Sequence, residues 1–387
     1  QAVASGRLAR LMRRAADMPL ARKLVMASAA VLLVLMSIST IFLGEATSRR
    51  LEQQALSDLD MRLKLVRGLL EVSAAGLEEK SVSFNRLFLS YFPEPITAET
   101  VNGHPSLRVG ATSLHGRTGE VDQLFSLTKS YSSVFVRSGE DFSRLSTSLR
   151  KENGERATGT PLGAEHPARA KLLAGEPYTG LVKMFGKDYY ARYTPIRNPD
   201  GGVIGAYFVG VDASAEMATL KKQILANKVG ETGYFYALDA RPGKNYGTLL
   251  VHPAKEGTNL LAARDDDGHE FIREMLEKKQ GLIRYPWKNA EMGEHFAREK
   301  IVAYEEFPAW HWVIAGGAYR DELDTAARQM QIKLALASLL VTILLLAIIH
   351  GLVRRFVDRP LQTALETFRA ISSGDFTTRV NVASNDE

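Results

Sequence analysis

The sequence predicts an α+β protein in which two antiparallel-sheet modules are supported by a long N-terminal helix, between two transmembrane helices. Two apolar runs, Leu24–Leu43 and Leu334–Val353, contain no Asp, Glu, Lys or Arg. Each has the ~20 residues that a helix needs to cross a bilayer. Leucines spaced three and four residues apart follow the first run, and strand-like alternation with turn signals fills most of the remainder.

The distribution of charge predicts how the two spans are oriented. The chain has a net charge of +5, and the arm before the first span accounts for it. Arg354, Arg355 and Arg359 follow the second span. Basic residues favour the cytoplasmic side, so both termini are expected in the cytoplasm and residues 44–333 outside. The first run exceeds the ~7–15 apolar residues of a signal peptide, which favours a retained anchor. Nucleic-acid binding by the arm is disfavoured, since no aromatic residues alternate with its arginines.

A long helix is expected over residues 44–95, ending before Pro93 and Pro95 because proline interrupts helical hydrogen bonding. Its apolar stripe has the spacing of a heptad seam. The stripe consists of Leu56, Leu59, Leu63, Val66, Leu70 and Leu77. We interpret it as the interface of a parallel homodimer. The same periodicity also permits a helix that packs its stripe on its own domain.

Two strand-rich stretches follow this helix, over residues 96–212 and 213–320. Turn-forming residues separate the expected strands, as in Asn198-Pro199-Asp200-Gly201-Gly202. Gly180-Leu181-Val182-Lys183 parallels Gly281-Leu282-Ile283-Arg284, and similar elements surround both segments. We therefore expect two copies of one small module. A last helix, over 321–353, continues without a stop signal into the second span.

Recognisable catalytic motifs are missing from the sequence. The chain has no cysteine, which excludes disulfides, thiolate metal sites and cysteine nucleophiles. His269-Glu270 lacks the second histidine of a zinc-binding helix, and Asp265-Asp266-Asp267 lacks the alternating spacing of a calcium loop. The chain is therefore expected not to be an enzyme, and to need neither a metal nor a cofactor.

Alternation along the strands of the first module predicts a pocket for a small organic anion. Residues two apart in a strand share a face, and guanidinium groups bind carboxylates with two hydrogen bonds. The expected ligand-binding residues are Arg144, Ser146, Thr147, Lys183, Phe185, Tyr190 and Arg192. The alternative is that these cations lie on the solvent face and pair with Asp188 and Glu140.

Short motifs over residues 56 to 320 resemble those of double Cache sensors, and the first module resembles a Cache 3/Cache 2 fusion domain. The matching segments of the first module are Arg144-Leu145-Ser146-Thr147, Gly154, Gly159-Thr160, Tyr178, Gly180, Tyr190, Tyr193-Thr194-Pro195-Ile196 and Gly205. Those of the second are Gly233-Tyr234, Asp239, His252-Pro253, Gly257 and Asn259-Leu260. The resemblance implies tandem PAS-like modules with the ligand in the first, membrane-distal one. A scaffolding role is then expected for Tyr234, Tyr236, His252, Trp287 and Tyr304.

The C-terminal tail resembles a cytoplasmic helical HAMP linker, and an ordinary juxtamembrane helix followed by a turn is the alternative. The residues that carry the resemblance are Pro360, Glu366, Gly374, Asp375, Asp386 and Glu387. The expected divisions are a basic arm (1–23), a span (24–43), the long helix (44–95), two Cache modules (96–212 and 213–320), a helix entering the second span (321–353) and a partial HAMP linker (354–387).

These resemblances imply the input half of a methyl-accepting chemotaxis receptor. Such a receptor is a two-pass homodimer of the bacterial inner membrane that binds a small extracytoplasmic ligand and controls a kinase complex in the cytoplasm. The alternative is the input half of a membrane-bound sensor histidine kinase or diguanylate cyclase. A surface module without a signalling role is a third reading, and the HAMP-like tail argues against it, because a simple anchor needs no cytoplasmic relay.

Overall fold

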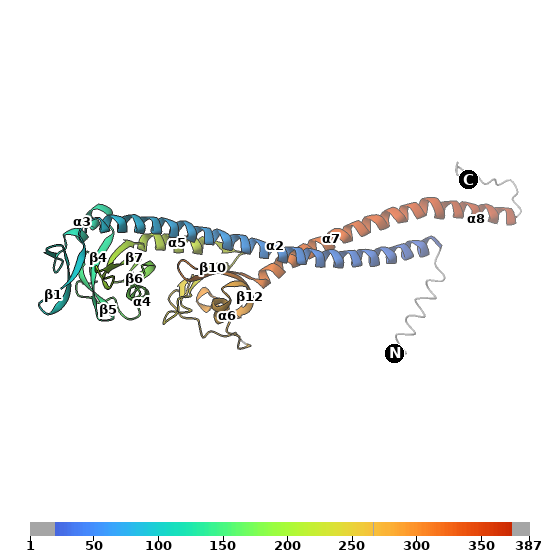
Figure 1. Cartoon of the computed structure of the whole chain (residues 1–387). Coiled ribbons are helices and arrows are strands. Elements are labelled where there is room, and N and C mark those ends of the chain that lie inside the picture. Colours follow the sequence, from blue (N-terminus) through green and yellow to red (C-terminus); the bar gives the residue numbers. More distant parts are fainter. Residues whose placement is uncertain (1–19, 266, 374–387) are drawn as a thin grey trace. The chain divides into compact units, whose positions relative to one another are not determined.

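The computed structural model describes residues 20–265 and 267–373, which form two compact units. One unit comprises the segments up to Leu56 and from Asp321 onwards, and the other is Ser57–Arg320. Both apolar runs lie in the first unit, and both sheet modules lie in the second (Figure 1).

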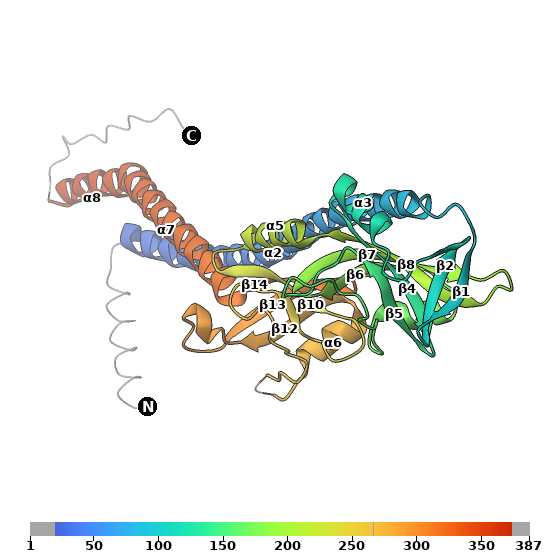
Figure 2. The same cartoon turned by 90° about the vertical axis from the view of Figure 1, so that its left-hand side faces the viewer.

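Helix α2 (Leu20–Leu89) includes the first apolar run and the long helix expected after it, without interruption. It ends before Pro93, as the helix-breaking effect of proline predicts. Helix α5 (Ser214–Ala226) lies beside α2 in both views (Figures 1 and 2). Met217, Leu220 and Ile224 of α5 share one apolar core with α2 and with strands of both modules. The two helices therefore form a common support for the two sheets.

The two modules have the same antiparallel strand order, which confirms the internal repeat. The first sheet has the order β5-β4-β8-β7-β6 and the second the order β11-β10-β14-β13-β12. In each, the first and last strands of the module are neighbours, and its second and third strands lie at opposite edges (Figure 2). The first sheet consists of β4 (Tyr131–Ser138), β5 (Asp141–Thr147), β6 (Tyr178–Met184), β7 (Lys187–Arg197) and β8 (Val203–Asp212). The second consists of β10 (Gly233–Asp239), β11 (Leu249–Val251), β12 (Gln280–Trp287), β13 (Arg298–Phe307) and β14 (Trp312–Tyr319).

Several smaller elements complete the modules, and most of them lack a strong sequence signal. A separate three-stranded sheet follows α2, and two short helices belong to the first module. These elements are β1 (Ile96–Val101), β2 (His104–Val109), β3 (Thr112–Ser113), α3 (Gly119–Thr128) and α4 (Pro167–Leu173). The second module adds β9 (Lys228–Val229), which pairs with β10 as a sixth strand of the sheet, the helix α6 (Phe271–Lys278) and the 3₁₀ turn η1 (Ala290–Met292).

The apolar stripe of α2 packs on the chain's own modules, so the dimer seam expected from the sequence is wrong. Leu59, Leu63, Val66, Leu70 and Leu77 are each at most 4% exposed and belong to the core shared with α5 and both sheets. Only Leu56, at the start of the stripe, is half-buried. A heptad pattern indicates that one face of a helix is buried, but not whether another chain or the same chain covers it. Here the covering surface belongs to the same chain.

The second apolar run lies in helix α7 (Arg320–Val353), which continues through a π-helical segment (Arg354–Asp358) into α8 (Arg359–Ser372). Pro360 directly follows the π-helical segment, in which the Arg359 N–H donates to the Arg354 carbonyl; a proline lacks the N–H for the next helical hydrogen bond, which accounts for the irregularity at this point. Glu366 also lies on α8. The other residues that carry the HAMP resemblance, Gly374, Asp375, Asp386 and Glu387, lie outside the described residues.

Candidate functional site

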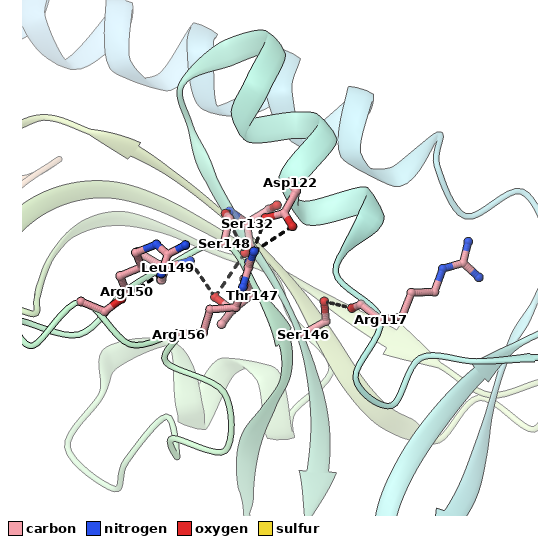
Figure 3. A network of polar contacts seen from close by, with 10 residues as sticks. Arg117, Asp122, Ser132, Ser146, Thr147, Ser148, Leu149, Arg150 and Arg156 are labelled. Carbon is pink, nitrogen blue, oxygen red and sulfur yellow. Dashed lines mark hydrogen bonds and ion pairs between the residues drawn. The ribbon is translucent and has the colours of Figure 1, made fainter.

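Ser146 and Thr147, expected in the ligand site, belong to a polar network that joins β5 to α3 (Figure 3). Arg156 donates two hydrogen bonds to the Asp122 carboxylate, each 2.8 Å, and a third of 2.7 Å to the Thr147 carbonyl. The Thr147 hydroxyl is 2.7 Å from the Ser133 hydroxyl. The Ser146 hydroxyl donates to the Arg117 carbonyl. Both side-chain hydroxyls are thus engaged within the chain, in contacts that fix the local fold.

The structure does not bring together the three cations on which the expected pocket was based. Tyr190 packs in the core that faces α2, and alternation along β7 places Arg192 on the same face. Nη1 of Arg192 donates a hydrogen bond of 3.1 Å to the Thr179 hydroxyl. Lys183 is exposed, whereas Arg144 lies over the opposite face of the sheet, beside Phe135. The predicted convergence of these side chains is therefore wrong.

Arg144 is nevertheless a buried cation without a carboxylate partner in the described part of the chain. It is 4% exposed, and its guanidinium carbon lies 4.9 Å and 5.5 Å from the ring centres of Phe135 and Phe185. Nη1 donates to the Thr160 hydroxyl (2.8 Å) and Nη2 contacts the Met184 sulfur (3.3 Å). Nε has no hydrogen-bond partner there.

This arrangement favours an anion as the missing partner. Burial lowers the pKa of the Arg144 guanidinium, although arginine stays charged in proteins. A buried charge is unfavourable unless an opposite charge or several hydrogen bonds compensate it. The aromatic rings attract the cation, but they provide no strong in-plane hydrogen-bond acceptor. A carboxylate would satisfy Nε and one terminal nitrogen together, with two parallel hydrogen bonds.

A surface cleft of about 360 Å³ is lined by Phe185, one of the two rings beside this guanidinium, but not by Arg144 itself. Phe185 contacts the guanidinium and also lines the cleft, so it separates the two. Phe185 and Gly186 form the tip of the β6–β7 hairpin with φ angles of 48° and 76°, values that a non-glycine residue adopts only at some cost. The basic residues of the cleft are Arg150, Lys151, Arg156 and Lys187, and its acidic residues are Asp122 and Glu152. Arg156 pairs with Asp122, and Lys187 and Lys151 pair with Asp212 and Glu155 beside the cleft, so most of this positive charge is compensated within the chain.

His166 and Tyr193 complete the surroundings of Arg144, and the sequence pattern did not indicate a ligand role for either. His166 caps α4, because the backbone N–H of Ala168 donates to its Nδ1. Its Nε2 therefore carries the proton and donates to the Tyr193 hydroxyl at 3.2 Å. Burial, assisted by the charge of Arg144, lowers the pKa of His166 to about 4. A neutral imidazole thus lies beside the buried guanidinium at neutral pH.

Acidification below pH 6.5 is expected to destabilise the sheet modules. Burial also lowers the pKa of His252 to about 4, with help from the Lys300 charge. The unfolded chain, with histidine pKa values near 6.5, then binds more protons between pH 6.5 and 4 than the folded chain does, so stability falls as the pH falls. Each histidine is expected to contribute a loss of about 1–2 kcal/mol at pH 5.

The measurement is the unfolding midpoint of the whole chain at pH values between 7 and 5. The variants His166→Asn and His252→Asn retain a side-chain acceptor for the local backbone N–H groups and do not titrate in this range. Each should make the loss of stability with acid shallower. An unchanged slope in both variants would show that the histidines are not the cause.

The chain belongs to the Cache 3/Cache 2 fusion domain family, and the match to this family covers residues 45–333. It is 28% identical over 226 residues to the methyl-accepting chemotaxis protein McpP of Pseudomonas putida, which corresponds to 54% of this chain and 40% of McpP. It is 22% identical over 368 residues to McpA of Bacillus subtilis, which corresponds to 95% of this chain and 49% of McpA. The chain thus spans about half the length or less of these relatives.

Solved sensor domains of chemoreceptors are also similar to this chain. The periplasmic sensory domain of the Campylobacter jejuni chemoreceptor Tlp1 is 13% identical, with a TM-score of 0.43 over 69% of this chain and 95% of that domain. A Cache chemosensory domain described for carboxylic acid recognition is 25% identical, with a TM-score of 0.24 over 27% of this chain and 71% of that domain.

Proposed function

We propose that this chain is the input half of a methyl-accepting chemotaxis receptor that senses a small organic anion outside the cytoplasmic membrane. The observation that carries the proposal is the Arg144 guanidinium, which is buried in a sensory module without a carboxylate partner among the described residues. Guanidinium groups in aromatic surroundings favour carboxylates. The input half of a histidine kinase or a diguanylate cyclase is the second candidate, because both use sensory modules of the same kind to control an output domain. Neither reading assigns catalytic activity to this chain.

A thermal-shift screen of the whole chain tests the sensing role. Small carboxylates should raise the unfolding temperature, because a ligand that binds only the folded state stabilises it. The uncharged amides of the same acids are the matched controls and should have no effect. Equal shifts with acids and amides would contradict an anion site.

The two candidate spans support an inner-membrane location with the sheet modules outside. Helices α2 and α7 each contain an 18-residue window of high mean hydropathy, 2.4 and 2.7, and little of either window is buried by the chain itself. The basic residues that flank the spans favour cytoplasmic termini. In this arrangement α7 would transmit a change from the second module into the membrane, and α8 would form the first helix of a HAMP relay.

Reporter fusions are expected to show this orientation. An alkaline phosphatase inserted near Gly154, in the first module, should be active because it reaches the periplasm. The same enzyme fused after Glu387 should be silent. The opposite pattern would place the sheet modules in the cytoplasm and contradict extracytoplasmic sensing.

Dimerisation through a second face of α2 is part of the proposal. Met61, Leu65 and Val72 are 59%, 61% and 75% exposed, and their spacing of four and seven residues places them on one side of the helix. Gly68 lies between them on the same side and would permit close approach of a partner helix. This stripe lies away from the stripe that is buried against the modules.

Disulfide cross-linking distinguishes the two faces of α2. The chain has no cysteine, so each single substitution introduces its only thiol. Leu65→Cys and Val72→Cys should cross-link two subunits on oxidation. Leu63→Cys and Val66→Cys should not, because both positions are buried within one chain. Efficient cross-linking at Leu63 or Val66 alone would restore the seam that the sequence pattern suggested.

A further inference from the structure

A cleft of about 290 Å³ lies between the two sheet modules and is lined by residues of both. Strands β6 and β7 of the first module contribute to its wall, as do β10, β11 and β14 of the second. Helix α5, which packs on both modules, contributes Met217 and Lys221. Ligand pockets commonly have volumes of ~300–1,000 Å³ and often occur where domains meet, so this cleft suits a small molecule.

Most of the charges in this inter-module cleft are already paired within the chain. Arg241 donates hydrogen bonds to the buried carboxylate of Asp239, 2.9 Å from Nε and 2.6 Å from Nη2. Lys221 of α5 forms an ion pair with Glu256 of the second module. These four groups therefore add no net charge to the cleft.

Lys183 and Asp188 are the charged lining residues that lack such a partner in the described part of the chain. They lie directly opposite each other on the hairpin of β6 and β7, so their side chains share one face of the sheet. Nevertheless they do not form an ion pair with each other, and Lys183 is exposed whereas Asp188 is half-buried. The hydrogen bond to Asp239 raises the pKa of Arg241, and the Asp188 charge adds to this effect without a direct contact.

An apolar surface adjoins these two charges. Leu181 lies two residues before Lys183 on β6 and therefore on the same face. Met217, Leu250 and Trp312 extend this surface along the cleft. Together the groups offer a cation for a carboxylate, a carboxylate for an ammonium group and an apolar area for a hydrocarbon group. A simple anion would lie beside Asp188 and a simple amine beside Lys183, and each would be repelled by the like charge.

We propose that the inter-module cleft binds a small zwitterion, with its carboxylate on Lys183, its ammonium group on Asp188 and an apolar side group towards Trp312. Arg144 does not line this cleft, so the site is separate from the anion site proposed for the first module and does not depend on it. The ligand would contact both modules. Its binding would therefore favour the arrangement of the modules that forms the cleft.

The test is calorimetric titration of the whole chain in lipid nanodiscs with L-valine, L-leucine and L-methionine. At least one of these zwitterions should bind. Its amide, which lacks the carboxylate, and the acid that lacks the amino group are the matched analogues. Each should displace the bound zwitterion at least about tenfold less effectively, because it leaves one charged group of the cleft without its hydrogen-bond partner. Binding by none of the three, or equally effective displacement by the acid, would overturn the proposal.

Charge-removing variants assign the site. Lys183→Gln and Asp188→Asn should each weaken binding of the zwitterion about tenfold. Lys171→Gln removes an exposed lysine on α4 and is the matched control. This variant and Arg144→Met should both leave the affinity within a factor of about two.

A double variant separates charge recognition from a structural effect. Lys183→Asp with Asp188→Lys exchanges the two charges and should bind the zwitterion more tightly than either reversal alone. Unchanged affinity in both Lys183→Gln and Asp188→Asn, or a loss in Arg144→Met alone, would place the zwitterion elsewhere and contradict the site. Thermal unfolding checks that the variants fold, and the comparison of analogues on the unaltered chain decides the matter if one does not.

Discussion

Replacing Arg144 with methionine is expected to weaken binding of the sensed anion by about 10- to 150-fold, since hydrogen bonds to charged groups contribute ~1.5–3 kcal/mol. The fold should persist, because methionine fills much of the same space and the substitution breaks no ion pair among the described residues. Calorimetric titration of the whole chain in nanodiscs, with an acid that the thermal-shift screen identifies, measures the effect.

Arg192→Met is the matched control. Arg192 is on the same sheet, but it lies on the face that packs towards α2 and donates to Thr179. Its replacement should leave the affinity within a factor of about two, a change below ~0.5 kcal/mol. Equal losses in the two variants would indicate a general effect on the module, and an unchanged affinity in Arg144→Met would remove the proposed site.

Leu70→Ala is expected to lower the free energy of unfolding of the sheet modules by about 2–5 kcal/mol, the range for truncating a fully buried leucine. Leu70 is 0% exposed in the core that joins α2 to α5 and both sheets. Leu127→Ala removes an apolar side chain of α3 that is 65% exposed and lies outside the proposed dimer stripe, and should change the free energy by less than ~0.5 kcal/mol.

Denaturant unfolding followed by tryptophan fluorescence measures this difference, because Trp310 and Trp312 belong to the same core. The account requires a large loss for Leu70→Ala that does not depend on protein concentration. A loss that diminishes at high concentration would mean that the buried stripe contacts a second subunit, as the heptad pattern alone suggested.

The sequence predicted the helices and strands well, but it did not predict which of them pack against one another. Uncharged runs located both apolar helices, and alternation with turn residues located the strands of both sheets. The stripe on α2 was also correctly read as buried. The surface that buries this stripe was not predicted correctly. The spacing of apolar residues reports only that a helix face is buried, and it is the same whether a neighbouring module or a second chain covers that face.

The prediction that the three cations converge was wrong because the sequence does not show which faces of the different strands lie on the same side of the sheet. Val134 pairs with Ser146 and Phe135 with Arg144, so Leu145 has no partner and the ladder is bulged there. The bulge breaks the alternation that had placed Arg144 and Ser146 together. Alternation also says nothing about which face of β7 matches which face of β5, since β4 and β8 lie between them. Among the expected ligand residues, Phe185 lies beside Arg144, whereas Lys183, Tyr190 and Arg192 do not.

The burial of Lys300 in the second module was not predicted, for a different reason. A lysine on a strand is normally exposed, and only the fold shows that this one is enclosed by tyrosines. His166 did have a local signal, because a polar residue directly before Pro167 is typical of a helix start. Its proximity to Arg144 depends on the packing of α4 against the sheet, which no local pattern contains.

A hybrid receptor tests the central claim most directly. Residues 1–387 would be joined in frame to the cytoplasmic signalling hairpin of a chemoreceptor, and the swimming bias of cells that carry only this receptor would be recorded. The account predicts a response to the anion that binds the purified chain, and loss of that response in Arg144→Met at equal expression. A hybrid that does not respond, or that responds equally with Arg144→Met, would contradict anion sensing through this site.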